Sequence, residues 1–215
     1  MRLRNIPGAK EAVAASSLVW NETAALEQRG SWQQIFPKTQ ALHLEIGMGR
    51  GLFITTLAKR FPDVNFLGLE IREEMVMQAL ERLSDAVEPA GSDNLRFLWL
   101  NAARMDELFA ENEVERIYIN FPDPWPKSRH ANRRLTALPL LAIYRKILAP
   151  GGELYFKTDN QPLFDWSVEN FTAAGWQLDE VSYDLPLERS IAVTEYENRY
   201  RGQGQPIYGL LARNE

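Results

Sequence analysis

The sequence of 215 residues contains no cysteine and only two histidines, His43 and His130. The lack of cysteine excludes disulfide bonds, thiolate metal sites and thiol nucleophiles. With so few histidines a metal centre would need mostly carboxylate ligands, so we expect no bound metal. No apolar run approaches the roughly 20 residues that a helix needs to cross a bilayer, and the opening MRLRNIPGAK lacks the apolar core of a secretory signal. We therefore expect a cytoplasmic protein without membrane contact.

The sequence also has no excess of basic residues. Its formal net charge is −5 at pH 7, which argues against a surface that coats nucleic acid everywhere but does not bear on a local basic patch. Hydrophobic residues make up 45% of the chain, which is enough for one sizeable core. We expect one main domain over residues 35–215, preceded by an extension over residues 1–34 that carries one or two helices.

Strand and helix patterns alternate along the chain from residue 41 onward. Strands are predicted over 41–46, 64–70, 95–100, 116–121 and 153–158. Helices are predicted over 52–60, 73–87, 135–148 and 161–174, and the segments 176–183 and 206–212 are predicted to close an edge of the sheet. This alternation is typical of an α/β fold with a doubly wound, mostly parallel sheet, whose ligands bind at the carboxyl ends of the strands.

A glycine-rich turn with the sequence EIGMGRG, residues 45–51, follows the first predicted strand. Its glycines, Gly47, Gly49 and Gly51, allow positive φ and let a ligand approach the backbone. The spacing G-x-G-x-G differs from the G-x-G-x-x-G of dinucleotide-binding folds, and the acid Glu45 disfavours a pyrophosphate. Glu45 instead suits a ligand with a positive end, such as the ammonium of S-adenosylmethionine. The alternative is an ordinary turn and acid of an α/β protein.

Polar residues end the next three predicted strands as well. Glu70 at the end of the second strand is placed to accept hydrogen bonds from ribose hydroxyls. Asn101 and Asp123 follow the third and fourth strands, so that four polar side chains would line a nucleoside pocket together with Glu45. Asn101 could bind the edge of an adenine, or it could cap the helix that follows.

The fourth strand runs into a proline-rich segment, INFPDPWPKSRHANRR, at residues 119–134. Prolines on both sides of Asp123 restrict its backbone and preorganise the carboxylate. Trp125 offers an aromatic face on which an extruded base can stack. From turn chemistry alone, the segment can equally be a proline-rich turn around a buried tryptophan.

This segment opens a stretch of the chain that is free of acidic residues. Residues 124–152 contain no Asp or Glu. The cations in that stretch are Lys127, Arg129, Arg133, Arg134, Arg145 and Lys146. Arginines in a loop directly after a strand end suit RNA phosphates, and the alternative is a solvated run of charge. We expect His130 to be a hydrogen-bond partner within the loop and His43 to be structural.

Four motifs together resemble a known family. They are EIGMGRG, FPDPWPKSRHANRRL, Thr158-Asp159 and the sequence TEYE at residues 194–197. The set is similar to that of the bacterial tRNA (guanine-N7-)-methyltransferases, which are class I S-adenosylmethionine-dependent enzymes, over about residues 35–212. Many methyltransferases share the glycine turn, whereas the proline-rich motif joined to the other two is specific. Asn132 stands where many relatives carry a basic residue, which would remove one phosphate contact.

The resemblance implies a Rossmann-like class I methyltransferase fold and methylation of N7 of a guanine in tRNA, in the variable loop. It implies a cofactor site for S-adenosylmethionine at Glu45, Gly47, Gly49, Glu70, Asn101 and Asp123. Asp123 would also be the catalytic residue. The residues implied to bind the tRNA substrate are Lys127, Arg129, His130, Arg133, Arg134, Asp159, Thr194, Glu195, Tyr196 and Glu197. The protein would need no metal and would be a monomer or a homodimer.

Two of these sites also match the patterns of helix starts. Thr194 and Glu197 match a capping box, and Asp159 suits the N-cap of the helix predicted over 161–174. If the resemblance holds, Glu195 and Glu197 would accept hydrogen bonds from the guanine edge. A helix start and a binding site are compatible in the TEYE sequence, and for Asp159 we favour substrate binding.

The implied chemistry fits a fixed carboxylate at Asp123. Guanine N7 carries a lone pair and no proton, so its attack on a sulfonium methyl needs placement and removal of water, not a general base. A carboxylate beside the purine would favour the developing positive charge and accept hydrogen bonds from N1–H and the amino group.

Three other classes of protein fit part of the pattern. A methyltransferase for a small molecule or a protein would use the cofactor acids but would not explain the basic stretch. A non-catalytic RNA-binding module would keep the basic stretch but have no use for those acids. A nicotinamide-dependent oxidoreductase fits worst, because the glycine spacing differs.

Overall fold

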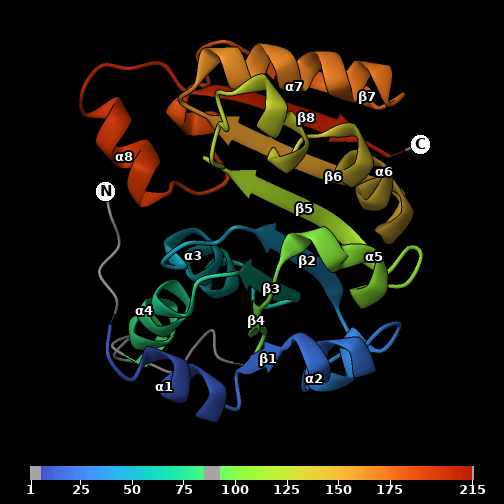
Figure 1. Ribbon diagram of the computed structural model, residues 1–215, viewed down its shortest axis with the longest axis vertical. Coiled ribbons are helices and arrows are strands. Elements are labelled where there is room, and N and C mark those ends of the chain that lie inside the picture. Colours follow the sequence, from blue (N-terminus) through green and yellow to red (C-terminus); the bar gives the residue numbers. More distant parts are fainter. Residues whose placement is uncertain (1–5, 85–92, 215) are drawn as a thin grey trace.

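An eight-stranded sheet with the order β1-β4-β3-β2-β5-β6-β8-β7 forms the centre of the computed structural model, which describes residues 6–84 and 93–214 (Figure 1). The strands are β1 (Val19–Asn21), β2 (Ala41–Ile46), β3 (Val64–Glu70), β4 (Leu95–Trp99), β5 (Val114–Asn120), β6 (Leu148–Thr158), β7 (Gln177–Ser182) and β8 (Tyr208–Arg213). Strands β1 to β6 pair in parallel, and β8 pairs antiparallel with both β6 and β7. The doubly wound, mostly parallel fold predicted from the sequence is confirmed.

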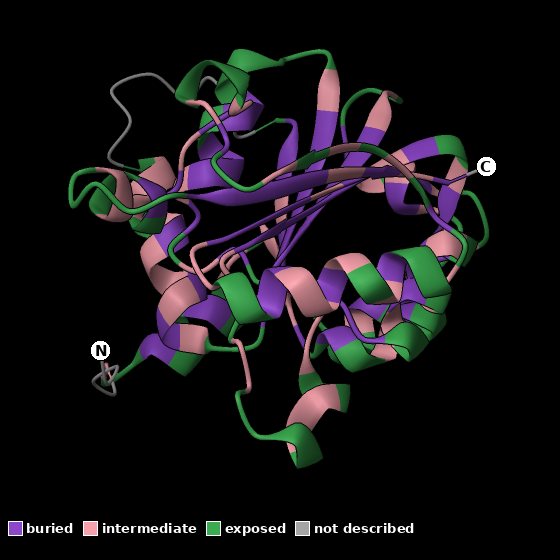
Figure 2. Cartoon of the chain, turned by 90° about the horizontal axis from the view of Figure 1, so that it is seen from above, coloured by how far each residue is buried: buried purple, intermediate pink, exposed green. Residues whose placement is uncertain are grey.

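Helices cover both faces of this sheet. Helices α1 (Ala9–Ala15), α3 (Leu52–Arg60) and α4 (Glu73–Ser84) pack in one hydrophobic cluster. Helices α2 (Glu22–Glu27), α5 (Met105–Leu108), α6 (Leu138–Ile147) and α7 (Gln161–Ala173) pack in a second, larger cluster. Figure 2 shows the buried strands between helices whose outer sides are exposed. Helix α8 (Glu195–Arg201) lies apart from these two layers (Figure 1).

Strand β2 shows why the sequence folds in this way. Its residues Leu42, Leu44 and Ile46 belong to the larger cluster. Successive side chains of a strand point to opposite faces, so His43 and Glu45 project toward the other face. A strand buried on both faces reads as a nearly continuous apolar run, and an acid within it is the exception that marks a site.

The structure refines several predicted boundaries. Strands β2 and β3 and helix α3 have the predicted bounds, whereas β6 begins at Leu148, because Pro150-Gly151-Gly152 is part of the strand. Helix α6 begins at Leu138, with a proline in its first turn, where a missing N–H costs nothing. Helix α4 is described as far as Ser84, and the end of the predicted helix over 73–87 lies outside the described residues.

The N-terminal segment contributes a strand to the sheet, which was not predicted from the sequence. Strand β1 pairs with β4, and Val19 lies opposite Phe97. The same N-terminal segment also contains the helical pieces α2 and η1 (Trp32–Ile35). Trp32 is fully buried, stacks on Phe109, and donates from Nε1 to the carbonyl oxygen of Leu108 at 2.9 Å. The domain boundary between residues 34 and 35 stays a prediction.

The strand order reverses direction at β2. From β2 the chain proceeds to β3 and β4 on one side and to β5 and β6 on the other, and Ile46 of β2 lies opposite Ile119 of β5. In doubly wound sheets the ligand crevice lies at this switch point, outside the carboxyl ends of the strands. The fold therefore places Glu45 and the segment after β5 at the edge where a ligand is expected.

Candidate functional site

The turn after β2 is open on its ligand side. Gly47, Gly49 and Gly51 have φ values of +76°, +55° and +75°. A Cβ built at Gly49 would meet no atom within 4 Å, whereas one at Gly51 would lie 2.7 Å from the Cβ of Ala79. Gly51 is thus required by packing against α4, while Gly49 leaves space that a ligand can fill.

Glu45 lies buried beside this turn with one oxygen unpartnered. Its Oε1 accepts a hydrogen bond from Nδ2 of Asn120 at 2.9 Å, and its Oε2 has no partner among the described residues. Burial raises the pKa of Glu45 to about 8, against the Asn120 hydrogen bond and the charge of Lys157, which lower it. A buried oxygen without a donor is costly, and a cationic N–H donor would satisfy it.

Glu70 supports the glycine turn from the neighbouring strand. One carboxylate oxygen accepts from the backbone N–H of Gly49 at 3.1 Å, and the other accepts from the N–H groups of Ile71 and Arg72. Burial raises its pKa, and the three backbone donors oppose that rise. Glu70 is therefore fixed in orientation at the carboxyl end of β3, the edge at which doubly wound sheets bind ligands.

Asn101 is exposed at the carboxyl end of β4 and has the capping role that the sequence left open. Its Oδ1 accepts from the N–H of Ala103 at 2.9 Å and caps the short helix η2 (Ala102–Arg104). Because Oδ1 is used by the cap, mainly the Nδ2 amino group of Asn101 is left to bind a ligand. The predicted contact with the cofactor stays a prediction.

Asp123 sits on a strained turn after β5. We define the proline turn as residues 121–126; within it Phe121 and Trp125 have φ values of +50° and +42°, which are rare for residues other than glycine. The N–H of Phe121 donates to the carbonyl oxygen of Lys157 at 2.8 Å, which ties the turn to β6. Asp123 is exposed, and its carboxylate has no hydrogen-bond partner in the described part of the chain. Strain that holds an unpaired acid in solvent is typical of a functional turn.

Arg134 supports the backbone of the proline turn. Its guanidinium donates to the carbonyl oxygens of Pro124 and Trp125, each at 3.1 Å, and lies over the ring of Trp166 at 4.3 Å. The sequence predicted an RNA contact for Arg134. The structure gives this side chain a bracing role in the fold, because two of its donors are directed at the turn, and its contact with RNA stays a prediction.

The other basic residues of the segment are placed as a surface loop. Lys127 precedes the 3-10 helix η3 (Ser128–Arg133), and Lys127 and Arg129 are exposed. The guanidinium of Arg133 lies 5.0 Å from the ring centre of Trp125, and His130 meets the edge of that ring. One face of Trp125 is thus covered by a cation, so a stacked base would have to use the other face or displace Arg133. His130 accepts a hydrogen bond from Nε of Arg129 at 3.4 Å, which confirms the prediction of a hydrogen-bond partner within the loop.

Asp159 lies after β6 without capping helix α7. The cap is Asn160, whose Oδ1 accepts from the N–H of Leu163 at 2.9 Å. Asp159 instead lies near Tyr200 of α8, and its negative charge raises the pKa of that tyrosine. The N-cap alternative for Asp159 is therefore wrong, and its carboxylate faces α8.

Replacement of Asn160 by Ala is expected to lower the free energy of unfolding by about 1 kcal/mol, the usual cost of a lost N-cap. Asp159→Ala is the matched control one residue away and should change that free energy by less than about 0.5 kcal/mol. Chemical denaturation of both variants measures the difference. Equal losses would contradict the assignment of the cap to Asn160.

The first three TEYE residues, at the start of α8, have three different roles. Thr194 caps the helix by accepting from the N–H of Glu197 at 2.9 Å. Glu195 forms ion pairs with Arg82 of α4 and, at 3.7 Å, with Arg50 of the glycine turn. It thereby connects α8 to the other side of the site. Tyr196 is 53% exposed, and its ring lies nearly parallel to that of Phe121, with centroids 6.3 Å apart.

Glu197 is a buried anchor, which corrects its predicted contact with guanine. Its side chain is 0% exposed, and both oxygens are taken by Lys157, Ser190 and Arg201. The carboxylate points inward and is used up by these partners, so the predicted capping box is realised only in the bond that Thr194 accepts. Burial would raise its pKa, but the charge of Lys157 and the hydrogen bonds outweigh burial and lower it. A base could meet this buried carboxylate only if its ion pairs with Lys157 and Arg201 opened.

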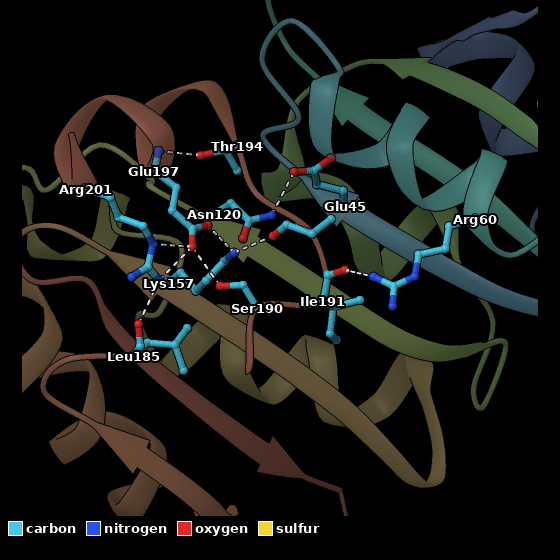
Figure 3. A network of polar contacts seen from close by, with 11 residues as sticks. Glu45, Arg60, Asn120, Lys157, Leu185, Ser190, Ile191, Thr194, Glu197 and Arg201 are labelled. Carbon is cyan, nitrogen blue, oxygen red and sulfur yellow. Dashed lines mark hydrogen bonds and ion pairs between the residues drawn. The ribbon is translucent and has the colours of Figure 1, made fainter. Parts of the chain in front are cut away.

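Sequence reasoning missed Asn120 and Lys157, the two buried residues that join the parts of this site. Asn120 is the last residue of β5 and donates to Glu45, and Lys157 in β6 donates to Glu197 at 2.6 Å (Figure 3). Both are polar residues inside strands that read IYIN and LYFKT. A lysine in a strand predicted to be buried was the available signal, since a buried lysine needs a partner.

Neither a membrane span nor a metal site is present in the ranges 6–84 and 93–214. No helix there is long and apolar enough to cross a membrane. No group of three or more His, Cys, Asp or Glu side chains in those ranges is arranged to hold a metal ion.

Solved methyltransferase structures share this fold. The 16S rRNA methyltransferase KamB aligns with a TM-score of 0.65 and 15% sequence identity over 90% of this chain and 94% of that one. An S-adenosylmethionine-dependent methyltransferase from Aquifex aeolicus aligns with a TM-score of 0.58 and 15% identity over 81% and 82%. The family model described as "Putative methyltransferase" matches residues 39–210. The fold and the open glycine turn at its switch point thus define a methyltransferase.

Comparison with named proteins of similar sequence defines the kind of methyltransferase more closely. A tRNA (guanine-N(7)-)-methyltransferase of Lachnoclostridium phytofermentans is 43% identical over 100% of this chain and 99% of its own length. One of Brevibacillus brevis is 43% identical over 99% and 98%. The chain belongs to the tRNA (guanine-N(7)-)-methyltransferase family.

Proposed function

We propose that this protein transfers a methyl group from S-adenosylmethionine to N7 of a guanine in tRNA, in the variable loop. The observation that carries the proposal is the arrangement at the switch point. A buried carboxylate with an unpartnered oxygen, Glu45, stands beside an open glycine turn, and the next strand ends in a strained turn that exposes Asp123. The first part suits a cationic nucleoside ligand, and the second suits a base on which positive charge develops.

The residues present fit S-adenosylmethionine. The unpartnered oxygen of Glu45 would accept a hydrogen bond from the ammonium of the cofactor. The open space over Gly49 would let the cofactor lie against the backbone of the glycine turn, and Glu70 would face the ribose. Asn101 at the end of β4 would reach the adenine. When bound, the cofactor supplies a methyl group on a positively charged sulfur. The chain supplies orientation, removal of water and the electrostatic field.

Asp123 would act on the guanine without moving a proton. Its unpaired carboxylate can accept from the N1–H and the amino group of the base, and its charge favours the positive charge that develops on the purine. The hydrogen bond from Phe121 to the carbonyl of Lys157 and the bracing by Arg134 fix the turn before the substrate arrives. Such preorganisation means that little reorganisation is needed during transfer.

The exposed groups around Asp123 would hold the RNA. Lys127, Arg129 and Arg133 are placed to meet phosphates, and His130 shapes their loop. Asp159 and the exposed members of the TEYE sequence lie on the side of α8. Glu195 would contact the substrate only after releasing Arg82 or Arg50. We place this reaction in the cytoplasm, where tRNA is abundant.

Replacement of Arg129 and Arg133 by Ala is expected to weaken tRNA binding at every salt concentration. Each lost phosphate contact should reduce the slope of log K against log salt by about 0.7–0.9. Titrations at several salt concentrations measure that slope. Lys146→Ala is the matched control, because Lys146 is an exposed cation of the same acid-free stretch at the far end of α6. An unchanged slope in the double variant would move the RNA surface elsewhere.

The proposed reaction is tested by incubating the protein with methyl-labelled S-adenosylmethionine and an unmodified tRNA transcript. Digestion to nucleosides should place the label in 7-methylguanosine. Label in a different nucleoside, or none in a protein that binds both molecules, would contradict the proposal.

A further inference from the structure

A buried cluster of charges connects the proposed cofactor site to α8. We call Glu45, Asn120, Lys157, Glu197 and Arg201 the interior cluster. Figure 3 shows Asn120 and Lys157 between Glu45 on one side and Glu197 on the other. Three strands and one helix supply these residues, since Glu45 is in β2, Asn120 in β5, Lys157 in β6 and the other two in α8.

Lys157 is the central cation of the interior cluster. Its Nζ donates to Oε2 of Glu197 at 2.6 Å and to the carbonyl oxygen of Ala192 at 2.9 Å. It also lies 5.3 Å from the ring centre of Phe53, on the α3 side. An ammonium has three donors, so Glu197 and Ala192 account for two of them.

Glu197 does not need Lys157 alone to balance its charge. Its other oxygen accepts from Nε and Nη2 of Arg201 at 3.0 and 2.9 Å and from the hydroxyl of Ser190 at 2.7 Å. Two cations, Lys157 and Arg201, therefore face one permanent anion. An ionised Glu45 would be the second anion that balances the interior cluster, and a protonated Glu45 leaves it one positive charge in excess.

We propose that Lys157 is a positioning residue that favours the ionised form of the Glu45 carboxylate for the cofactor ammonium while it anchors α8 through Glu197. The inference rests on the proposed function, because it assigns a task toward that cofactor. One side chain would thus couple the cofactor acid to the segment that presents Tyr196 and Glu195 to the substrate. The carbonyl of the same residue holds Phe121 of the proline turn.

The surroundings of Glu45 support this assignment. Burial raises the pKa of Glu45 to about 8, while the Asn120 hydrogen bond and the charge of Lys157 lower it and the charge of Glu70 raises it. Burial also lowers the pKa of Lys157, and the charges of Glu197 and Glu45 raise it. Lys157 lies opposite Asn120, the hydrogen-bond partner of Glu45, in the register of β5 and β6. Its charge lowers the pKa of Glu45, so its removal should make Glu45 harder to ionise.

Lys157→Met tests the proposal by calorimetric binding of S-adenosylmethionine across a pH series. In the wild type, affinity should rise with pH until Glu45 is ionised, near pH 8. In the variant, that rise should move upward by about one pH unit, with affinity at neutral pH about tenfold lower. Arg60→Gln is the matched control, because Arg60 holds the same segment through the carbonyl of Ile191 without reaching Glu45. It should reproduce the wild-type curve.

The double variant Lys157→Met/Glu197→Gln separates positioning from stability. Removal of one partner of a buried ion pair is destabilising, whereas removal of both charges is often neutral. The double variant still contains Arg201, which keeps its hydrogen bond to the carbonyl oxygen of Leu185 but loses the charge of Glu197. It should melt between Lys157→Met and the wild type and still show the shifted pH curve. Curves of both variants that superimpose on the wild type would overturn the inference. A wild type that binds no S-adenosylmethionine at any pH would overturn the proposed function itself.

Discussion

Asp123→Asn is expected to lower the single-turnover rate of methyl transfer by about 10²–10³-fold, the usual loss for one preorganised electrostatic group. Asn retains one acceptor for the guanine edge but loses the negative charge that favours the developing cation. The proline turn should survive the change, because it is held by Phe121 and Arg134 and not by the Asp123 side chain. Affinity for tRNA should therefore fall little.

The pH profile of the same step discriminates between charge stabilisation and general-base catalysis. Guanine N7 has no proton to lose, so the rate with saturating tRNA and cofactor should be nearly flat around neutral pH. Single-turnover measurements of wild type and variant supply both results. A full rate in Asp123→Asn, or a wild-type ionisation near neutral pH that the substitution abolishes, would contradict this role.

Glu45→Gln is expected to weaken binding of S-adenosylmethionine by about 10²-fold, or about 3 kcal/mol, as for the loss of one partner in a buried charge pair. The substitution keeps the shape of the side chain and its acceptor for Asn120 but removes the charge from the unpartnered position. Binding of tRNA should be unchanged, because the phosphate contacts lie after β5. Calorimetry with each ligand separately measures both affinities.

The protonation state of Glu45 decides whether the affinity for S-adenosylmethionine rises or falls with pH. Its pKa of about 8 means that the carboxyl holds its proton at lower pH, and binding of an ammonium then requires loss of that proton. Wild-type affinity should fall by about tenfold for each pH unit below that value. The Gln variant has no such proton, so its affinity should be weak and independent of pH in this range. Equal losses of cofactor and tRNA affinity would count against separate sites.

Much of the fold was predictable because its strands are buried. Apolar runs bounded by glycine and polar residues defined β2, β3 and α3 to the residue. Strand β1 was missed because its three residues, Val19–Asn21, are too short to show a period. Only its pairing with β4, more than seventy residues further on, makes the strand recognisable.

Candidate site residues could be predicted where acidic side chains follow strands or where the turn requires glycine. The buried ion pairs of the interior were harder to predict. Glu45 and Asp123 were evident as acids at strand ends. Glu197 was expected to face the base, but burial and its ion pairs with Lys157 and Arg201 turn it inward. The pairing with Lys157 joins residues forty positions apart, and local sequence carries no signal for it. The sequence likewise did not predict the bracing role of Arg134, because its hydrogen-bond partners depend on how the proline turn folds back on it.

Methylation of two tRNA transcripts, one with guanosine and one with 7-deazaguanosine throughout, tests the central claim most directly. The 7-deaza base keeps the N1–H and amino group that Asp123 would hold but replaces the nucleophilic N7 by a carbon. We expect the substituted transcript to bind with nearly wild-type affinity and to compete with the normal one, yet to accept no methyl group from labelled S-adenosylmethionine. Methyl transfer to the 7-deaza transcript at the normal rate would contradict the account.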